Sequence, residues 1–401
     1  MKIIRVEAIA IQAQPIDKKP YWGSRAWGDE RRGPGEISTE SPAPQRRRYV
    51  YSRTIDTVIV RIETDTGHVG WGEAKAPVAP QATAKIVELL LADIVIGADP
   101  RETTLLWERM YAGMRVRGHR QGFWLEAISG VDIALWDLAG QAAGAPITTL
   151  IGGSFRNPVR VYASGLPALP LDAPDAAIAE LVAEAKALRD AGYTGLKMAI
   201  GRGLKGDLRS IGAVRDALGG DFILYADAAG VYSRAQALWL GRGLEELGVG
   251  FFEMPTFPED VEGYAELAQA LTIPIALDSI GSRHEAVELI RARAIDVLQP
   301  DVCRAGGITE CRRIAELGDA HGLAFAPHIS IGSAIHFAAS AHLASAMPNT
   351  LTSEYWIGAN PIGDAVVETP LNLAEGYLHT PTSPGLGIAI KEHELRRHAA
   401  A

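Results

Sequence analysis

The chain has 401 residues, of which 47% are hydrophobic and 22% charged, and its formal net charge is −9. The length predicts one large domain with a smaller one, and the acidic balance argues against a nucleic-acid-binding surface. Only two cysteines occur, too few for a disulfide framework or a zinc site, so we expect a cytoplasmic protein. Met1 to Glu7 is strand-like and charged, so we expect no signal peptide, and the short apolar runs predict no membrane span.

The first 127 residues have the pattern of an α+β domain. Alternating apolar and polar residues predict three strands, Ile3–Ile11, Thr57–Glu63 and His68–Glu73. Apolar residues at helical spacing predict three helices, Ala82–Ala92, Arg101–Met114 and Leu125–Ala143. We therefore predict a separate α+β domain over residues 1–127.

A long irregular segment, residues 14–53, interrupts this domain after its first strand. It holds Trp22, Trp27 and several arginines, Arg25 among them, together with closely spaced prolines and glycines. Structureless loops of this length inside a compact domain are commonly functional or disordered. Two interpretations stay open, a solvated basic surface loop or a lid in which Trp22 and Arg25 contact an anionic substrate.

After Pro158, strand patterns alternate with helical patterns. We expect eight strands, Val159–Ala163, Gly195–Ile200, Phe222–Asp227, Gly250–Glu253, Pro274–Asp278, Val297–Asp301, Ala324–His328 and Leu351–Glu354. Asp172 is predicted to N-cap the first intervening helix, and Gly192 to end it. Eight strand–helix units predict a (β/α)8 barrel of the TIM type over residues 128–356, with a modified last unit as an alternative. Segment 357–401 is rich in Pro and Gly at its start, and we expect it to return to the first domain.

Three acidic residues, Asp227, Glu253 and Asp278, end three successive predicted strands at intervals of 26 and 25 residues. One βα unit of a barrel has about this length, so the carboxylates are predicted to meet at the C-terminal rim. Carboxylate oxygens without nitrogen or sulfur partners favour Mg²⁺, with Mn²⁺ as an alternative. The alternative for each acid alone is a helix cap or a surface loop.

Other polar residues fall at the ends of neighbouring strands. Lys197 lies inside an apolar strand, where an ammonium needs a paired carboxylate. Asp301 and His328 end adjacent strands and are predicted to form a dyad in which the carboxylate orients the imidazole. Glu354 ends the last strand and is expected to complete the ring. Tyr162 and Ser164, which follow in the first barrel strand, are candidate substrate contacts.

This set of residues resembles the enolase superfamily, in its mandelate racemase-like branch (the mandelate racemase/muconate lactonizing enzyme family), over nearly the whole chain. Gly70–Glu73 resembles a strand of the family's N-terminal capping domain, and Gly130–Gly140 with Leu150–Gly153 resemble its helix and the entry to its barrel. The matches at functional positions are the metal ligands Asp227, Glu253 and Asp278, the dyad Asp301 and His328, and the final acid Glu354. The resemblance implies a magnesium enzyme, expected to be a homo-oligomer, that removes the proton α to a carboxylate.

Four positions depart from the family's pattern. Lys197 matches the first lysine of a Lys-x-Lys pair, but Ala199 replaces the second lysine, which is the base on that face of the site. Ala229 stands where the family has asparagine, Met254 replaces a second glutamate, and Asp278 replaces the commoner glutamate. The predicted site is therefore a mixture of features from different members.

The missing lysine decides the expected reaction. A two-base racemase needs a proton-transfer group on both faces, and alanine cannot supply one, so only the His328 face is equipped. We therefore predict β-elimination of water from an acid sugar by a dehydratase, with Lys197 binding the substrate carboxylate or acting as base instead of His328. The alternatives are a racemase or epimerase, a cycloisomerase of a sugar lactone, and a non-catalytic acid-sugar binder.

Overall fold

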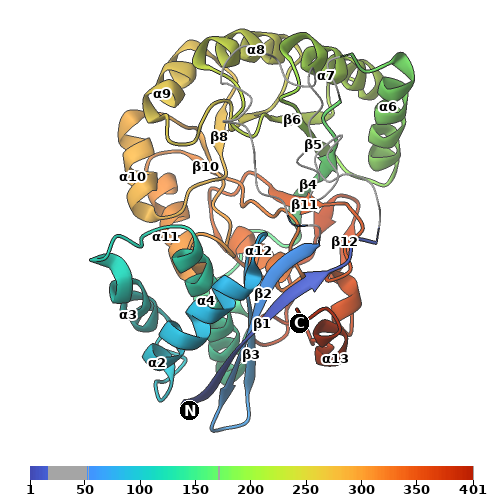
Figure 1. The fold of residues 1–401 in the computed structure, drawn as a ribbon. Coiled ribbons are helices and arrows are strands. Elements are labelled where there is room, and N and C mark those ends of the chain that lie inside the picture. Colours follow the sequence, from blue (N-terminus) through green and yellow to red (C-terminus); the bar gives the residue numbers. More distant parts are fainter. Residues whose placement is uncertain (17–51, 53, 170–171, 401) are drawn as a thin grey trace.

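The computed structural model describes residues 1–16, 52, 54–169 and 172–400. In Figure 1 a small domain built from the first part of the chain lies against a ring of strands and helices built from the rest. Trp22 and Arg25, the two predicted substrate contacts of segment 14–53, lie outside the described residues. Across the described residues, no helix combines the length and the apolar composition that crossing a membrane requires.

The small domain is a three-stranded antiparallel sheet covered by helices. Its strands, in the order β1-β2-β3, are β1 (Ile3–Ala13), β2 (Ile55–Thr64) and β3 (Val69–Ala74). The helical segments are α1 (Pro80–Ile86), a π-helical turn (Val87–Leu91), α2 (Ala92–Val95), α3 (Thr103–Arg115) and α4 (Phe123–Ala143). The predicted helix over Ala82–Ala92 is therefore part of a longer run that contains a π turn. The three predicted strands and the two later helices are present with small shifts at their ends.

Two glycines set how closely α4 approaches the sheet. A Cβ added to Gly72 on β3 would lie 1.9 Å from the carbonyl oxygen of Gly130 on α4. A Cβ added to Gly130 would lie 2.7 Å from the Val60 side chain on β2. Both contacts are too short for any side chain, so the helix rests directly on the sheet. This contact fixes the end of β3, which reaches the barrel.

The large domain is a closed parallel barrel. Its strands are β4 (Val159–Leu166), β5 (Gly195–Ala199), β6 (Ile223–Asp227), β7 (Phe252–Glu253), β8 (Ile275–Leu277), β9 (Val297–Leu298), β10 (Ala324–Phe325) and β11 (Ser353–Trp356). Each strand pairs with the next from β4 to β10, β11 pairs with β4, and a bridge from Phe325 to Thr350 closes the ring. The predicted capped (β/α)8 fold is confirmed by this topology.

Seven helices follow the first seven strands and surround the ring (Figure 1). They are α6 (Asp175–Asp190), α7 (Leu204–Leu218), α8 (Arg234–Glu246), α9 (Val261–Ala270), α10 (Arg283–Ala292), α11 (Gly307–Ala320) and α12 (Ala334–Ala346), with the short α5 (Ile147–Ile151) before the barrel. The prediction that Asp172 caps the N-terminus of α6 is wrong. Helix α6 begins at Asp175, and its N-cap position is Pro174, which makes no side-chain capping hydrogen bond. Gly192 follows the end of α6 with a positive φ, as predicted.

Strands β9 and β10 end earlier than predicted. The predicted strands ran to Asp301 and His328, whereas the observed ones stop at Leu298 and Phe325. Pro300 and Pro327 explain the difference, since proline has no N–H to donate to the next strand. Asp301 and His328 therefore lie on short connections beyond the ladder, directly above the barrel.

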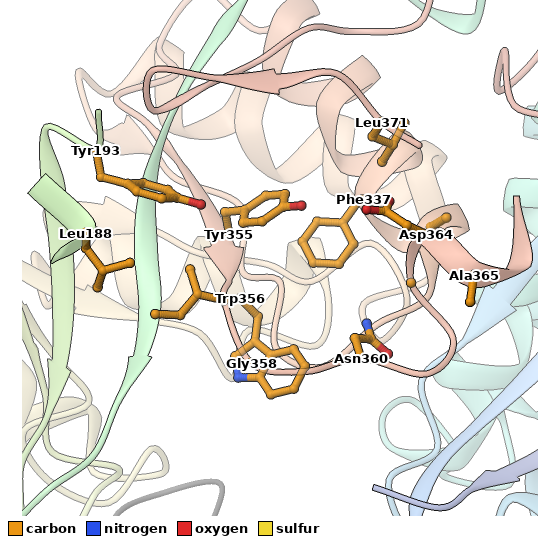
Figure 2. A pocket seen from close by; sticks show the side chains of 13 residues that line it. Leu188, Tyr193, Phe337, Tyr355, Trp356, Gly358, Asn360, Asp364, Ala365 and Leu371 are labelled. Carbon is orange, nitrogen blue, oxygen red and sulfur yellow. The ribbon is translucent and has the colours of Figure 1, made fainter. Parts of the chain in front are cut away.

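Among the described residues, no α-helix packs behind β11 as the eighth helix of the barrel, so the last unit is modified. The chain instead runs through an irregular segment with a 3-10 turn (Asp364–Val366), a hairpin of β12 (Leu373–Ala374) and β13 (Tyr377–Leu378), and α13 (Glu392–Arg396). On the outer side of β11, this leaves a pocket of about 320 Å³ lined by aromatic side chains, among them Tyr193, Phe337 and Tyr355 (Figure 2). The pocket lies outside the barrel and contains none of the predicted site residues.

The end of the chain returns to the small domain. The Gln12 N–H donates to the His398 carbonyl at 2.8 Å, and the Ala400 N–H donates to the Ala10 carbonyl at 2.8 Å. Arg396 on α13 forms an ion pair with Glu7 on β1 at 2.9 Å. These contacts support the prediction that segment 357–401 completes the capping domain, although the domain boundaries themselves stay a prediction.

Candidate active site

The three predicted metal ligands lie at the C-terminal ends of adjacent strands. Asp227 ends β6, Glu253 ends β7 and is its register neighbour, and Asp278 follows β8 directly. Asp227 and Glu253 are buried, and Asp278 is mostly so. The spacing of 25 to 26 residues thus translates into neighbouring positions on one rim, as expected for a parallel barrel.

Lys197 on β5 lies inside this ring of acids. Its Nζ is 2.9 Å from both carboxylate oxygens of Glu253 and 3.0 Å from Oε1 of Glu354. Burial lowers the pKa of Lys197, but Glu253 and Glu354 outweigh it and hold the pKa well above its usual range. The acids therefore hold the lysine as a cation, which is how a fully buried ammonium can be tolerated.

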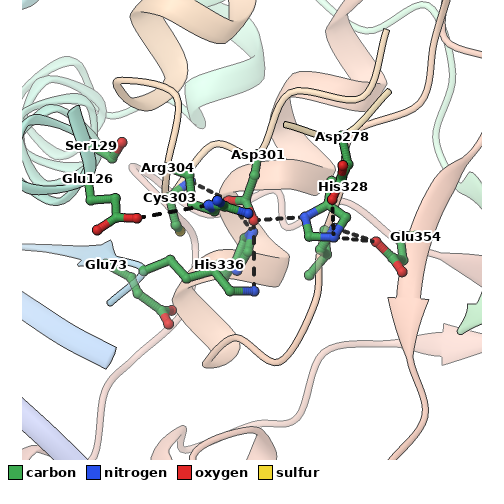
Figure 3. Close-up of polar contacts among 12 residues, drawn as sticks. Glu73, Glu126, Ser129, Asp278, Asp301, Cys303, Arg304, His328, His336 and Glu354 are labelled. Atoms are coloured by element: carbon green, nitrogen blue, oxygen red, sulfur yellow. Dashed lines mark hydrogen bonds and ion pairs between the residues drawn. The ribbon is translucent and has the colours of Figure 1, made fainter. Parts of the chain in front are cut away.

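His328 and Asp301 form the predicted pair. His328 Nδ1 is 3.0 Å from Asp301 Oδ2, and its Nε2 points to the carboxylates of Asp278 at 3.6 Å and Glu354 at 3.7 Å (Figure 3). Burial raises the pKa of Asp301, but the adjacent histidines and Lys75 hold it well below the usual range. A carboxylate anion on Nδ1 leaves Nε2 as the nitrogen that faces the ring, as proton transfer to a substrate requires.

Glu354 connects the lysine with the histidine. Its Oε2 accepts a hydrogen bond from the Ile329 N–H at 2.8 Å, and its Oε1 pairs with Lys197. Burial raises the pKa of Glu354, while Lys197 and then His328 lower it to about 2. The glutamate is thus an anion at neutral pH and can orient both neighbours.

Position 199, on the face of the site opposite His328, is an alanine, whose side chain cannot transfer a proton. Ala199 is buried at the end of β5, where its register neighbour is Asp227. Two other departures from the family pattern have left-handed backbone, Ala229 with φ of 48° and Met254 with φ of 42°. The Ala229 N–H donates to Asp227 Oδ1 at 2.8 Å, so this unusual conformation holds a predicted ligand in place.

The structure places the two candidate substrate contacts of β4 deep in the barrel. Tyr162 packs against Tyr225 and Phe251 with its ring centroid 5.7 Å from Lys197 Nζ, and Ser164 lies next to Glu354. Each residue is only 1% exposed. This burial favours a role in supporting the lysine and Glu354, and direct contact with a substrate stays a prediction.

Sequence reasoning missed three buried polar residues around the site. Gln299 donates to Glu253 Oε2 at 2.9 Å, and His336 Nε2 and Lys75 Nζ lie 3.1 and 3.9 Å from the Asp301 carboxylate. One signal was present, because His336 interrupts the apolar start of α12. Lys75 follows β3 of the capping domain, and nothing local to its sequence pairs it with Asp301.

The donor set fits a hard divalent cation. Glu253, Asp278 and His328 offer atoms that lie within 4.8 Å of one another, and Asp278 Oδ1 is buried without a hydrogen-bond partner among the described residues. Asp227 is not in this tightest group, and its Oδ2 lies 3.8 Å from Lys197 Nζ. Buried carboxylate oxygens are the donors that Mg²⁺ prefers.

Comparison with known proteins agrees with this geometry. Residues 38–152 match the model of the mandelate racemase/muconate lactonizing enzyme N-terminal domain, and residues 180–394 match that of the enolase C-terminal domain-like family. D-galactarolactone cycloisomerase of Agrobacterium fabrum is 37% identical over 84% of this chain and 90% of its own length. Arabinonate dehydratase of Saccharolobus solfataricus is 34% identical over 84% and 89%.

One similar solved structure contains magnesium. The crystal structure of a racemase from Streptomyces coelicolor with bound magnesium has a TM-score of 0.83 and 26% identity, covering 99% of this chain and 100% of that one. A magnesium ion bound at such a site would supply positive charge next to a substrate carboxylate. The chain belongs to the mandelate racemase/muconate lactonizing enzyme branch of the enolase superfamily.

Proposed function

We propose that this protein is a magnesium-dependent acid-sugar dehydratase, with Mn²⁺ as an alternative metal. The observation that carries the proposal is the single proton-transfer face, in which His328 Nε2 faces the carboxylate ring while Ala199 occupies the opposite strand end. The family relationship and the relatives named dehydratases support it. The substrate is a small carboxylate with a hydroxyl group β to it, as in an aldonate or aldarate.

Each residue has a role in this reaction. When bound by Asp227, Glu253 and Asp278, Mg²⁺ supplies the positive charge that acidifies the α proton. His328 Nε2 takes that proton, and Asp301 holds the imidazole and stabilises its charge. Lys197 offers an ammonium to the substrate carboxylate.

Loss of the β-hydroxyl group then completes the elimination on the face of the substrate next to His328. The electron pair left on the α carbon forms the double bond as the bond from the β carbon to its hydroxyl breaks. His328 returns the proton to the leaving oxygen, and water departs. The enol product rearranges to a 3-deoxy-2-keto acid, so the histidine serves first as base and then as acid.

A second candidate is cycloisomerisation of a sugar lactone. It is favoured by the relative of 37% identity, which is named D-galactarolactone cycloisomerase. In that reaction the same α proton is removed, and the oxygen that leaves the β carbon is the ring oxygen of the lactone. The residues act in the same roles, so Ala199 is compatible with both reactions. It disfavours the racemase alternative, and the relatives named as enzymes do not support the non-catalytic binder.

One experiment separates these candidates. The protein with Mg²⁺ is incubated in D₂O with a library of aldonates, aldarates and their lactones. After allowance for deuterium taken up from the solvent, a dehydratase gives a keto acid lighter than its substrate by one water, whereas a cycloisomerase gives a ring-opened product of the same mass as its substrate. Exchange of the α proton with retention of the substrate, or its epimerisation, would indicate a racemase. Absence of exchange with every compound would contradict the proposed function.

A further inference from the structure

The Asp301 carboxylate is surrounded by donors from four parts of the fold. Its Oδ1 accepts a hydrogen bond from the Cys303 N–H at 2.8 Å and lies 3.1 Å from His336 Nε2. Its Oδ2 lies 3.0 Å from His328 Nδ1 and 3.9 Å from Lys75 Nζ. A carboxylate offers about four acceptor positions, so it can take the two hydrogen bonds from Cys303 and His328 and still attract the two further cationic side chains. Figure 3 shows both histidines next to this carboxylate.

These donors come from separate elements. Cys303 belongs to the connection that carries Asp301, His328 to the connection after β10, and His336 to the first turn of α12. Lys75 follows β3 of the capping domain, and its N–H donates to the Cys303 carbonyl at 2.9 Å. The capping domain is therefore hydrogen-bonded to the connection that carries Asp301.

The side-chain nitrogens of His336 and Lys75 have the Asp301 carboxylate as their ion-pair partner. Within the described part of the chain, neither His336 nitrogen nor Lys75 Nζ forms an aligned hydrogen bond, so both residues contact Asp301 as ion-pair partners. His336 is fully buried and Lys75 is 4% exposed. Buried donors of this kind are costly unless an acceptor is close, and the Asp301 carboxylate is the acceptor within ion-pair distance of both.

A metal site is the competing explanation for His336, since Glu73, Cys303 and His336 offer atoms within 4.8 Å of one another. The Glu73 oxygens already accept hydrogen bonds from the Ser333 hydroxyl at 2.6 Å and the Thr57 hydroxyl at 2.8 Å. Burial also raises the pKa of the Cys303 thiol well above its usual range, which disfavours a thiolate ligand. The cluster is therefore packing between the cap and the barrel.

We propose that His336 and Lys75 are positioning residues of the Asp301–His328 dyad. They hold the Asp301 carboxylate in one orientation, so that its Oδ2 stays on His328 Nδ1 and His328 Nε2 stays aimed at the substrate. The proposal rests on the proposed function, in which His328 moves the proton. It also makes the capping domain part of the proton-transfer apparatus through Lys75.

The activity test compares His336→Leu with His336→Gln, which retains an amide donor near the position of Nε2. His336→Leu should lower kcat for α-proton exchange roughly 10–100-fold with little change in KM, as loss of a supporting partner does elsewhere. His336→Gln should recover most of this loss. The control is His342→Leu, which removes another buried histidine of α12 that contacts Thr148 and Leu386 and not the dyad. It should lower thermal stability and leave kcat per folded molecule unchanged.

Two outcomes of that comparison overturn the proposal. One is wild-type kcat in folded His336→Leu, and the other is an equal loss of kcat in His336→Leu, His336→Gln and His342→Leu. A second test repeats His336→Leu in an Asp301→Asn background, where a residue that acts through Asp301 should cost little more. If His336→Leu lowered kcat by the same factor in both backgrounds, the residue would not act through Asp301, and the proposal would be overturned. If His336→Leu does not fold, Lys75→Met is compared with Lys75→Arg under the same criteria.

A measurement without substrate keeps this inference separate from the proposed function. In protein labelled with ¹⁵N-histidine, the Nδ1–H signal of His328 is identified by its loss in His328→Gln. The signal should be protected from solvent exchange in the wild type and in His342→Leu, and should shift or exchange faster in His336→Leu. An unchanged signal in folded His336→Leu would overturn the positioning role. A wild type that turns over no acid sugar would contradict the proposed function and leave this test in force.

Discussion

Replacing His328 by asparagine tests the centre of the proposed mechanism. The imidazole is nearly buried, with Nδ1 on Asp301 and Nε2 facing Asp278 and Glu354. The asparagine amide can reach the position of Nδ1 and keep a donor on Asp301, but no atom replaces Nε2. The fold and metal binding should therefore persist, since Asp301 retains donors from Cys303 and His336.

The loss of turnover should match the loss of a general acid–base group. Such groups contribute roughly 10²–10⁴-fold, which corresponds to about 3–5 kcal/mol of barrier at about 1.4 kcal/mol per tenfold change. The loss should be at the high end or beyond it, since His328 acts twice in the proposed cycle. Asp301→Asn should cost a comparable factor or less, because it removes the orienting charge and leaves the base.

The assay follows α-proton exchange in D₂O and product formation in the same samples, with circular dichroism as the control for folding. His328→Asn should lose both signals together. Exchange at the wild-type rate with continued product formation would show that His328 is not the base. Lys197, whose Nζ lies among Glu253 and Glu354, would then be the base on the other side of the barrel.

Three further outcomes are expected. Chelation should abolish activity and Mg²⁺ should restore it, and full activity after exhaustive chelation would contradict the metal site. Gly72→Ala should destabilise the fold by about 1–3 kcal/mol in denaturant titration, since its Cβ meets the Gly130 carbonyl, whereas Gly220→Ala enters open space and serves as the control. Asp132 is a buried residue of α4, and its burial raises its pKa from 3.8 to about 7, so the folded state holds this proton more tightly than the unfolded chain. That stability is complete below pH 3.8 and is lost as the pH rises to about 7, so the melting temperature of Asp132→Asn should fall less than that of the wild type over this range. If the melting temperatures of the two proteins changed equally with pH, the raised pKa of Asp132 would be refuted.

The sequence by itself determined the barrel and the arrangement of the acids on its rim. Strand and helix patterns alternate with a period that brings Asp227, Glu253 and Asp278 to neighbouring strand ends, because parallel strands place all their C-termini on one side. The one-sided site was also readable, since Ala199 cannot transfer a proton whatever surrounds it. Local residue types carry both arguments, so no tertiary information was needed.

Only the tertiary structure decided which polar groups surround the dyad and which candidates are buried. Lys75 and His336 meet at Asp301 from the capping domain and from α12, and no local pattern encodes a contact between such distant segments. Tyr162 has the spacing of a residue at the mouth, but its ring lies in the aromatic layer inside the barrel. Inward-facing residues of one strand lie at different depths in the barrel. Their depth depends on how the neighbouring strands are staggered, and this stagger is set only when the barrel closes.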